Sequence, residues 1–289
     1  MINRFKVEVP AGQLDMRLCV TSGQVFRWRE VSPNQFVGVD GDYWYSISPT
    51  FEVESNGTLK EFSNLFRLDV TQEDIEREVV SRGPELAPYV HRLRGLRLMR
   101  PTGLVESMFC FLCTPNNHLT RITAMVRELG GYGEPLGGGA PEGLTRFPSI
   151  DRIASISEAE LRAKGFGYRG GTIPSIARQV LAKPTGWLES LKAAPYQVAV
   201  DELTTLKGVG PKLADCIALF ALHKMEAAPV DTHLWQACVR EYFPEFKGKS
   251  LTDARYHQIG NFLRERFGPL TGIAHQYLFY DNLLRHRGQ

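Results

Sequence analysis

The pattern of apolar and polar positions divides the chain into a β-rich first part and a helical remainder. Residues 24–29 alternate polar with apolar side chains, as a half-buried strand does. The sequence Asp-Gly-Asp at 40–42 predicts a hairpin turn leading into a strand over residues 43–48, and Asn-Gly at 56–57 predicts another turn. Up to about residue 70 the pattern therefore predicts an antiparallel sheet, covered on one face by helices.

From about residue 69 onward the apolar spacing becomes helical. One predicted helix has its apolar face on Leu104, Met108, Phe109 and Leu112. The glycine-rich residues 130–143 predict a flexible loop with little structure of its own, and helices resume near residue 149. The predicted fold class is α+β, with an N-terminal antiparallel sheet domain over residues 1–100 and an all-α body over residues 101–289.

Composition limits the possible classes. The chain has 289 residues, 43% of them hydrophobic and 23% charged, which excludes a largely disordered protein. The five cysteines are widely scattered, so a disulfide framework is not expected and a reducing compartment is. No apolar run is long enough for a membrane span, and the first residues have no apolar targeting segment. A net charge of +2 argues against a basic coat for nucleic acid.

The segment over residues 203–216 predicts a helix–hairpin–helix at about residues 200–223. Gly208 and Gly210 bracket a tight turn, and Pro211 occupies the favoured first position of the next helix. Such a turn exposes backbone N–H groups beside a helix N-terminus and forms a site for an anion, which on DNA is a backbone phosphate. A plain turn between two helices is the alternative interpretation.

Lys212 stands in the first turn of this second helix, where the helix dipole disfavours a cation. It is either a phosphate-binding lysine or a nucleophile whose pKa is lowered by the positive field and by partial burial. Asp231 precedes an amphipathic run, so we expect it to cap that helix. Paired with Lys212, it is also a candidate carboxylate facing the same cleft, where it can stabilise a cationic sugar in a transition state.

These motifs resemble a known family. The sequence LKGVGPKLADC at 206–216 and PVDTHLW at 229–235 are similar to the helix–hairpin–helix, Gly/Pro-rich loop and aspartate motif of the DNA glycosylase superfamily. Within it, the match is to the eukaryotic-type 8-oxoguanine DNA glycosylases. The same resemblance is carried by TSGQVFRWRE at 21–30, CTPNNHLTRITAMV at 113–126, KGFGYRGGTI at 164–173 and FGPLTGIAHQYLFYDNLL at 267–284.

The resemblance implies a bifunctional enzyme that flips an oxidised guanine out of duplex DNA. Lys212 would attack the sugar C1′ and displace the base, and Asp231, in a catalytic loop at about 224–235, would offset the developing positive charge. The resulting Schiff base would allow β-elimination of the 3′ phosphate. An alkylated-base DNA glycosylase and a non-catalytic helix–hairpin–helix protein are the alternatives. Lys212 argues against the first, and the intact pair of Lys212 and Asp231 argues against the second.

The resemblance also implies a base pocket. The Gly23 carbonyl would accept the N7 hydrogen that distinguishes 8-oxoguanine, Cys216 and Phe279 would sandwich the base, and Pro229 would bind it. One departure concerns the Watson–Crick edge, because His275 stands where the family usually has glutamine. The neighbouring Gln276 is turned by about 100° around a helix and is not expected to substitute. The departure predicts tolerance for other oxidised purines.

The remaining implied contacts are with the DNA. Asn116, Arg121, Tyr168 and an exposed Arg169 would fill the gap and read the orphaned cytosine, while His233, Gly208 and Gly210 would lie at the backbone. The acidic stretches at 73–76 and 158–160 fall outside this face, so a DNA-binding groove is compatible with the small net charge.

We expect no metal and no cofactor. Only Cys238 follows Asp231, too few for the iron–sulfur cluster of some superfamily members. Cys110 and Cys113 are expected to pack in the core. The expected partner is double-stranded DNA containing oxidised guanine, without membrane contact, bound by a monomer. The expected location is the cytoplasm, with the nucleoid, in a prokaryote, or the nucleus in a eukaryote.

Overall fold

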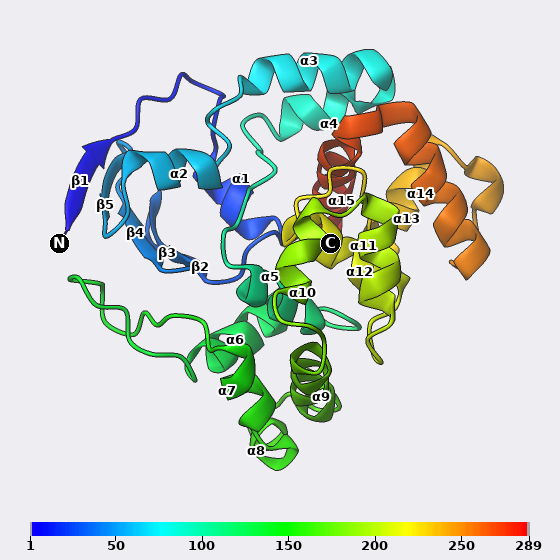
Figure 1. Cartoon of the computed structure of the whole chain (residues 1–289). Coiled ribbons are helices and arrows are strands. Elements are labelled where there is room, and N and C mark those ends of the chain that lie inside the picture. The colour runs from blue at the N-terminus through cyan, green and yellow to red at the C-terminus, as the bar shows by residue number, and fades with distance from the viewer. Residues whose placement is uncertain (1, 288–289) are drawn as a thin grey trace.

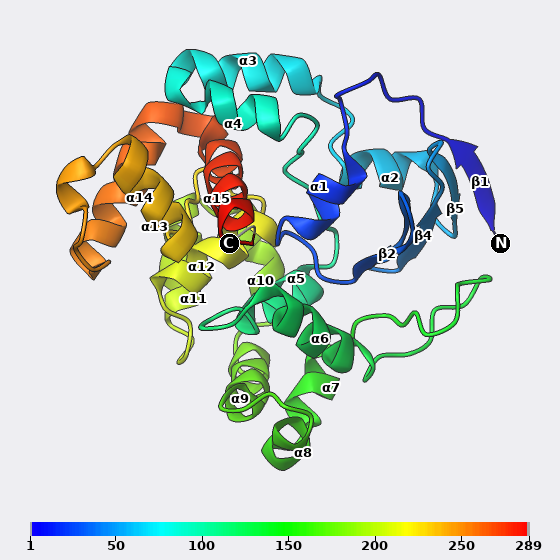
Figure 2. The same ribbon diagram turned by 180° about the vertical axis from the view of Figure 1, so that it is seen from behind.

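A computed structural model describes residues 2–287 and has the predicted α+β fold. Figure 1 shows a curved sheet on one side and a body of helices on the other, and Figure 2 shows the same two parts from behind. Within the described part of the chain, no helix combines the length and the apolar character needed to cross a bilayer.

The sheet has five antiparallel strands in the order β1-β5-β4-β3-β2. Their bounds are β1 Asn3–Lys6, β2 Trp28–Ser32, β3 Gln35–Asp40, β4 Tyr43–Ile47 and β5 Glu52–Ser55. The expected strand over residues 24–29 is wrong for its first four residues, because β2 begins only at Trp28. Gln24 instead accepts from the Met99 backbone N–H at 2.7 Å, and Arg27 pairs with Glu106 at 3.0 Å. These bonds tie the segment before β2 to the chain leading into the helical body.

The helices before the long loop are α1 Met16–Thr21, α2 Leu59–Leu65, α3 Gln72–Arg82, α4 Ala87–Arg92, α5 Leu104–Leu112 and α6 Leu119–Gly130. Those after it are α7 Ile150–Ser155, α8 Glu158–Ala163, α9 Arg169–Leu181, α10 Trp187–Ala193, α11 Tyr196–Thr204, α12 Pro211–Phe220, α13 Thr232–Glu241, α14 Asp253–Phe267 and α15 Thr271–Arg287. Short 3₁₀ turns occur at Pro84–Leu86, Pro244–Phe246 and Gly268–Leu270.

Besides a small cluster of three buried residues, the described part of the chain has two large hydrophobic cores. The smaller one joins the sheet to α2, with Trp28 stacked on Tyr45 and Phe66 packed edge-on against Trp28. The larger one fills the helical body, and α3 and α4 contribute Val79 and Tyr89 to it although they precede residue 100. A domain boundary at residue 100 stays a prediction.

The glycine-rich segment after α6 is more structured than expected. Pro135 and Thr145 form an isolated β-bridge, and Leu136 packs against Val39 and Trp44 of the sheet. In Figure 1 this segment extends from α6 towards the strands. The prediction of a loop with little structure of its own therefore holds for most of the segment, but the buried leucine among the glycines anchors it to the sheet.

A buried carboxyl ties together the helices that carry the site. Asp215 on α12 is 3% exposed and accepts hydrogen bonds from Tyr196, at 2.5 Å, and from Tyr256 on α14. Burial raises the pKa of Asp215, while both hydroxyls oppose this shift by stabilising the carboxylate. The two tyrosines thus fix α12 relative to α11 and α14.

Replacing Tyr256 by phenylalanine is expected to lower the free energy of unfolding by about 1–3 kcal/mol, because a buried acceptor loses a donor. Urea unfolding measures the change. The matched control is Tyr45→Phe, because the Tyr45 hydroxyl is buried without a partner among the described residues. Its removal is expected to leave stability unchanged or increased. Equal losses in both variants would contradict this account of Asp215.

Candidate active site

The predicted helix–hairpin–helix is present. The helix α11 ends at Thr204, and Gly210 precedes Pro211 in extended conformation. Gly208 has φ of 108°, in the region that favours glycine. The side chain of Gln179 on α9 spans the hairpin, accepting from the Lys207 N–H at 2.7 Å and donating to the Lys207 carbonyl at 3.2 Å. This brace was not predicted, since α9 is distant in sequence.

A cavity of about 470 Å³ lies where α12, the segment before α13, α15 and the turn after α1 meet. This cavity is lined by all of the predicted catalytic and base-binding residues, which are Gly23, Lys212, Cys216, Pro229, Asp231, His275 and Phe279. His233 also lines the cavity. A second cavity of about 760 Å³ shares Lys212 and Asp231 and also touches Asn116. The two candidate catalytic residues therefore lie where the two cavities adjoin.

Lys212 is half-buried in this cavity, and its Nζ donates to Thr114 Oγ1 at 3.3 Å. Burial favours the neutral amine, but Cys216 and Asp231 outweigh it and raise the pKa of Lys212. The expectation of a lowered pKa is thus wrong for the protein without DNA. Burial raises the pKa of the Cys216 thiol to about 11, so at neutral pH Asp231 is the negative charge beside the lysine. The amine must lose a proton before it can attack.

This raised pKa predicts the pH dependence of lysine reactivity. Below its pKa, the amine fraction of Lys212 increases roughly tenfold for each pH unit. We therefore expect reductive methylation of Lys212 by formaldehyde, measured by peptide mass spectrometry without DNA, to keep rising from pH 7 through pH 9. Exposed Lys60 in the same digest serves as the reference. A plateau of Lys212 labelling near pH 8 would show a lowered pKa instead.

Asp231 caps α13, as predicted. It has extended backbone geometry, and its Oδ1 accepts from the Leu234 N–H at 2.8 Å. This bond holds the carboxylate at the start of the helix while the residue lines the cavity beside Lys212. The position is therefore suited to stabilising positive charge that develops in the cavity.

The turn after α1 is held from behind by a buried glutamine. Gly23 has φ of 78°, a backbone conformation that favours glycine. A Cβ there would meet its nearest neighbours only at an ordinary 3.6 Å, so the backbone conformation and not lack of space accounts for the glycine. Gln24 is 2% exposed and donates to Ser22 Oγ at 2.9 Å and to the Arg97 carbonyl at 2.8 Å. The sequence analysis did not predict this role of Gln24, although a glutamine directly after Gly23 in the SGQ motif was a signal for it.

His275 is 3% exposed, and its ring lies parallel to that of Phe279, with centroids 5.7 Å apart. Burial and then the positive charge of Lys212 lower the pKa of His275 to about 3, while the Pro229 carbonyl opposes this shift. Gln276 lines the same cavity and donates to the Ser22 carbonyl at 3.0 Å. Gln276 therefore lines the site next to His275, and whether it can substitute for the family's glutamine stays a prediction.

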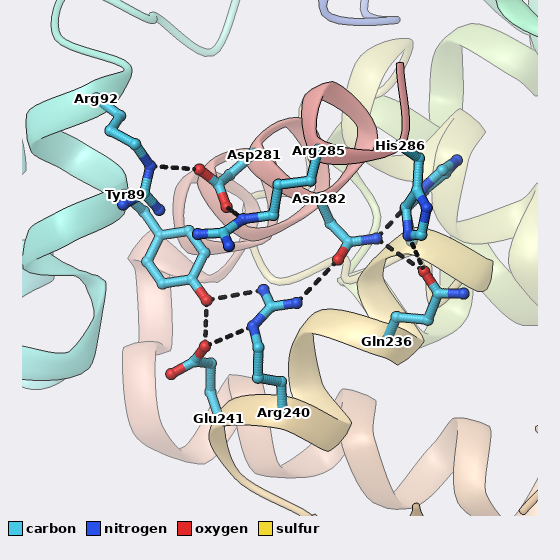
Figure 3. A network of polar contacts seen from close by, with 10 residues as sticks. Tyr89, Arg92, Gln236, Arg240, Glu241, Asp281, Asn282, Arg285 and His286 are labelled. Atoms are coloured by element: carbon cyan, nitrogen blue, oxygen red, sulfur yellow. Dashed lines mark hydrogen bonds and ion pairs between the residues drawn. The ribbon is translucent and has the colours of Figure 1, made fainter. Parts of the chain in front are cut away.

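A network of hydrogen bonds and ion pairs lies behind His233, which lines the first cavity (Figure 3). Asn282 Nδ2 contacts His233 Nδ1 at 3.3 Å and donates to Gln236 Oε1 at 2.9 Å. Arg240 donates to Asn282 Oδ1 at 3.0 Å and to the Tyr89 hydroxyl at 2.9 Å. The network connects His233 on α13 with α15 and α4, which the sequence did not predict, since its members are far apart in the chain.

The predicted cytosine-reading residues gather at one place outside the first cavity. Arg169 is only 4% exposed, and its guanidinium donates to the Pro115 carbonyl and, at 3.4 Å, to that of Asn116. The expectation of an exposed Arg169 is wrong, because the carbonyls of this turn take up its donors. Tyr168 is 53% exposed, and Arg121 donates to the Gly165 carbonyl at 3.1 Å.

All five cysteines are buried and free. Cys110 and Cys113 are buried and free, as predicted for residues packed in the core. Over residues 2–287, no group of three or more histidine, cysteine, aspartate or glutamate side chains is arranged to hold a metal ion.

Comparisons with known proteins agree with this geometry. The family model described as "8-oxoguanine DNA glycosylase, N-terminal domain" matches residues 6–107. The N-glycosylase/DNA lyase OGG1 of Arabidopsis thaliana is 34% identical over 293 residues, which covers 96% of this chain and 80% of that protein.

Solved structures are similar over the whole chain. The Clostridium acetobutylicum 8-oxoguanine glycosylase/lyase, bound to double-stranded DNA with cytosine opposite 8-oxoguanine, has a TM-score of 0.83 and 26% identity, with 100% of this chain and 99% of that chain covered. The 3-methyladenine DNA glycosylase of Archaeoglobus fulgidus has a TM-score of 0.73 and 20% identity over 98% of both chains, so it shares the fold.

Proposed function

We propose, from the premise that this chain belongs to the family of 8-oxoguanine N-glycosylase/DNA lyases, that it excises 8-oxoguanine from duplex DNA and then cleaves the abasic strand. The observation that supports the proposal is one cavity lined by Lys212, Asp231 and the Gly23 turn. A flipped purine needs an enclosed pocket, and a lyase needs an amine at its mouth.

In the proposed reaction, the Lys212 amine forms a bond to C1′ of the lesion nucleotide after losing its extra proton. The C1′–N9 bond breaks, and the base leaves with the electron pair and takes up a proton. Asp231 stabilises the positive charge on the sugar during this step. Opening of the sugar ring gives an iminium between Lys212 and C1′. Loss of a C2′ proton then expels the 3′ phosphate, and water releases the lysine.

Other residues that line the same cavity recognise the lesion in this proposal. The Gly23 carbonyl accepts the N7 hydrogen that guanine lacks, and Gln24 keeps that turn in place. Phe279 and Cys216 contact the two faces of the base, and Pro229 forms part of the wall. His275 is neutral at physiological pH and faces the base as an uncharged imidazole.

The proposed DNA contacts lie outside the base pocket. The N–H groups of the turn with Gly208 and Gly210, together with His233, bind backbone phosphates. Tyr168 is the exposed aromatic side chain that enters the gap left by the flipped base. Asn116, Arg121 and Arg169 read the orphaned cytosine, with Arg169 first releasing part of its contact with the Pro115 turn. We propose a monomer acting on duplex DNA, at the nucleoid in the cytoplasm of a prokaryote or in the nucleus of a eukaryote.

A single incubation tests the proposal against its alternatives. The protein is mixed with a duplex carrying 8-oxoguanine opposite cytosine, with and without borohydride, and free base, strand cleavage and covalent adduct are measured. The proposal predicts all three products. Base release without an adduct indicates a glycosylase that activates water, as expected of an alkylated-base enzyme. Binding without base release indicates a non-catalytic DNA-binding protein.

A further inference from the structure

Lys212 has a neighbour that has no role in the reaction as proposed above. The lysine Nζ donates to Thr114 Oγ1 at 3.3 Å. The other groups that raise the pKa of the lysine are Cys216, on the same helix, and Asp231, which caps α13. Thr114 comes from a separate element, just after α5, and lines both cavities, as the lysine does. The threonine therefore contacts the candidate nucleophile at the place where the two cavities adjoin.

The two hydrogen bonds of the Thr114 hydroxyl fix its direction. Oγ1 lies 2.8 Å from the Phe111 carbonyl and 3.3 Å from Lys212 Nζ. A carbonyl oxygen can only accept and an ammonium can only donate, so the single hydroxyl hydrogen goes to Phe111 and a lone pair goes to Lys212. A hydroxyl that was free to rotate could donate to a neutral amine and cover the lone pair that makes it a nucleophile. The Phe111 carbonyl prevents this, so Thr114 stays an acceptor after Lys212 has lost a proton.

This hydroxyl is held in place by its surroundings. Threonine is branched at Cβ, which restricts its χ1, and the following Pro115 restricts the backbone of Thr114. Phe111 is 3% exposed and stacks on Phe220 of α12, with ring centroids 4.9 Å apart. Because α12 also carries Lys212, the acceptor and the amine belong to one packed unit.

We propose that Thr114 is a positioning residue for Lys212: its hydroxyl holds one N–H of the amine, so that the lone pair stays available to C1′. The inference rests on the proposed function, because it requires C1′ of a lesion nucleotide at this lysine. A neutral lysine amine has two N–H bonds and one lone pair, so an acceptor beside it restrains the lone pair without occupying it. At 3.3 Å the bond is at the long end of the usual range, so it orients the amine and adds little stability.

The test removes the hydroxyl and keeps the shape of the side chain. Thr114→Val has the same branching and no acceptor, and the Phe111 carbonyl still accepts from the backbone N–H of residue 114, at 3.0 Å. Single-turnover base release from a duplex with 8-oxoguanine opposite cytosine is expected to slow roughly tenfold at saturating protein, since the amine is aligned with C1′ less often. Thr114→Ser restores the hydroxyl and is expected to recover most of the rate.

Two further measurements distinguish orientation of the amine from damage to the turn. An acceptor stabilises an ammonium more than an amine, so Thr114→Val is expected to lower the pKa of Lys212. Reductive methylation of Lys212 at pH 8 without DNA is therefore expected to rise about twofold or more while base release falls. Duplex binding, measured by fluorescence anisotropy, is expected to stay within about twofold of wild type. A damaged turn would weaken binding together with the rate, because the turn also carries Asn116 and holds Arg169.

The control is Ser81→Ala, at an exposed position on α3. It removes a hydroxyl that donates to the carbonyl three residues earlier, Glu78, at 2.8 Å, as Thr114 does to Phe111. It is expected to keep the wild-type rate, duplex binding and Lys212 labelling.

The outcomes separate this inference from the proposed function. If wild-type protein releases no base and forms no borohydride adduct, both are overturned. If wild-type protein is active, a wild-type rate in Thr114→Val, or a rate in Thr114→Ser as low as in Thr114→Val, overturns the role of Thr114 alone. If Thr114→Val does not fold by thermal unfolding, Thr114→Ala enters the same comparison, and a wild-type rate in that variant overturns the inference.

Discussion

Replacement of Lys212 by glutamine is expected to abolish the covalent adduct with DNA and to slow base release by at least about 10³-fold. Glutamine preserves much of the side-chain length but has no amine that can form an iminium. The lysine Nζ donates to Thr114 Oγ1 at a long 3.3 Å, so little stability is lost with this bond. Single-turnover base release and gel detection of the borohydride adduct measure both effects.

The control for this prediction is Lys60→Gln, which removes the same charge from an exposed position on α2. It is expected to retain adduct formation and base release. Binding of the lesion duplex by Lys212→Gln, measured by fluorescence anisotropy, is expected to persist, because turn N–H groups supply the phosphate contacts in the proposal. If Lys212→Gln released the base at the wild-type rate, the lysine would act in DNA binding or in stability and would not be the nucleophile.

Replacement of Asp231 by asparagine is expected to slow base release by about 10²–10³-fold, because the negative charge beside the sugar is lost. Stability is expected to change by less than about 0.5 kcal/mol, because asparagine is as good an N-cap as aspartate. The bond from the Leu234 N–H to Oδ1, at 2.8 Å, has an equivalent in the asparagine side chain. Single-turnover kinetics and urea unfolding, measured on the same preparation, separate catalysis from capping.

The comparison with Asp231→Ala completes this test. Alanine removes both the charge and the cap, so it is expected to lose about 0.5–2 kcal/mol of stability as well as the rate. Equal rates for Asp231→Asn and wild-type protein, with a slow and unstable alanine variant, would mean that Asp231 acts only by capping α13.

The sequence correctly predicted those parts of the site whose conformation depends only on a few neighbouring residues. The turn at Gly208, the first helical position of Pro211 and the capping role of Asp231 follow from local backbone requirements, and the structure has all three. The burial of Arg169 was missed because it depends on the carbonyls of Pro115 and Asn116, far away in the chain.

The same limit applies to the supporting residues. The contact of Gln276 with Ser22 joins α15 to the turn after α1, and the network through Asn282 and Arg240 joins three helices. Neither leaves a periodic pattern in the sequence. The raised pKa of Lys212 depends first on Cys216, one turn along α12, and then on Asp231 before α13, and the sequence pattern did not show that the two together outweigh burial. The supporting contacts of the site therefore depend on long-range packing, which local sequence patterns do not predict.

The most direct measurement is the identity of the residue that joins the DNA. Wild-type protein is incubated with a duplex carrying 8-oxoguanine opposite cytosine, reduced with borohydride and digested, and the modified peptide is sequenced by mass spectrometry. The account predicts that the reduced sugar remnant is attached to Nζ of Lys212. Attachment to another amine, or efficient base release without any attached peptide, would contradict it.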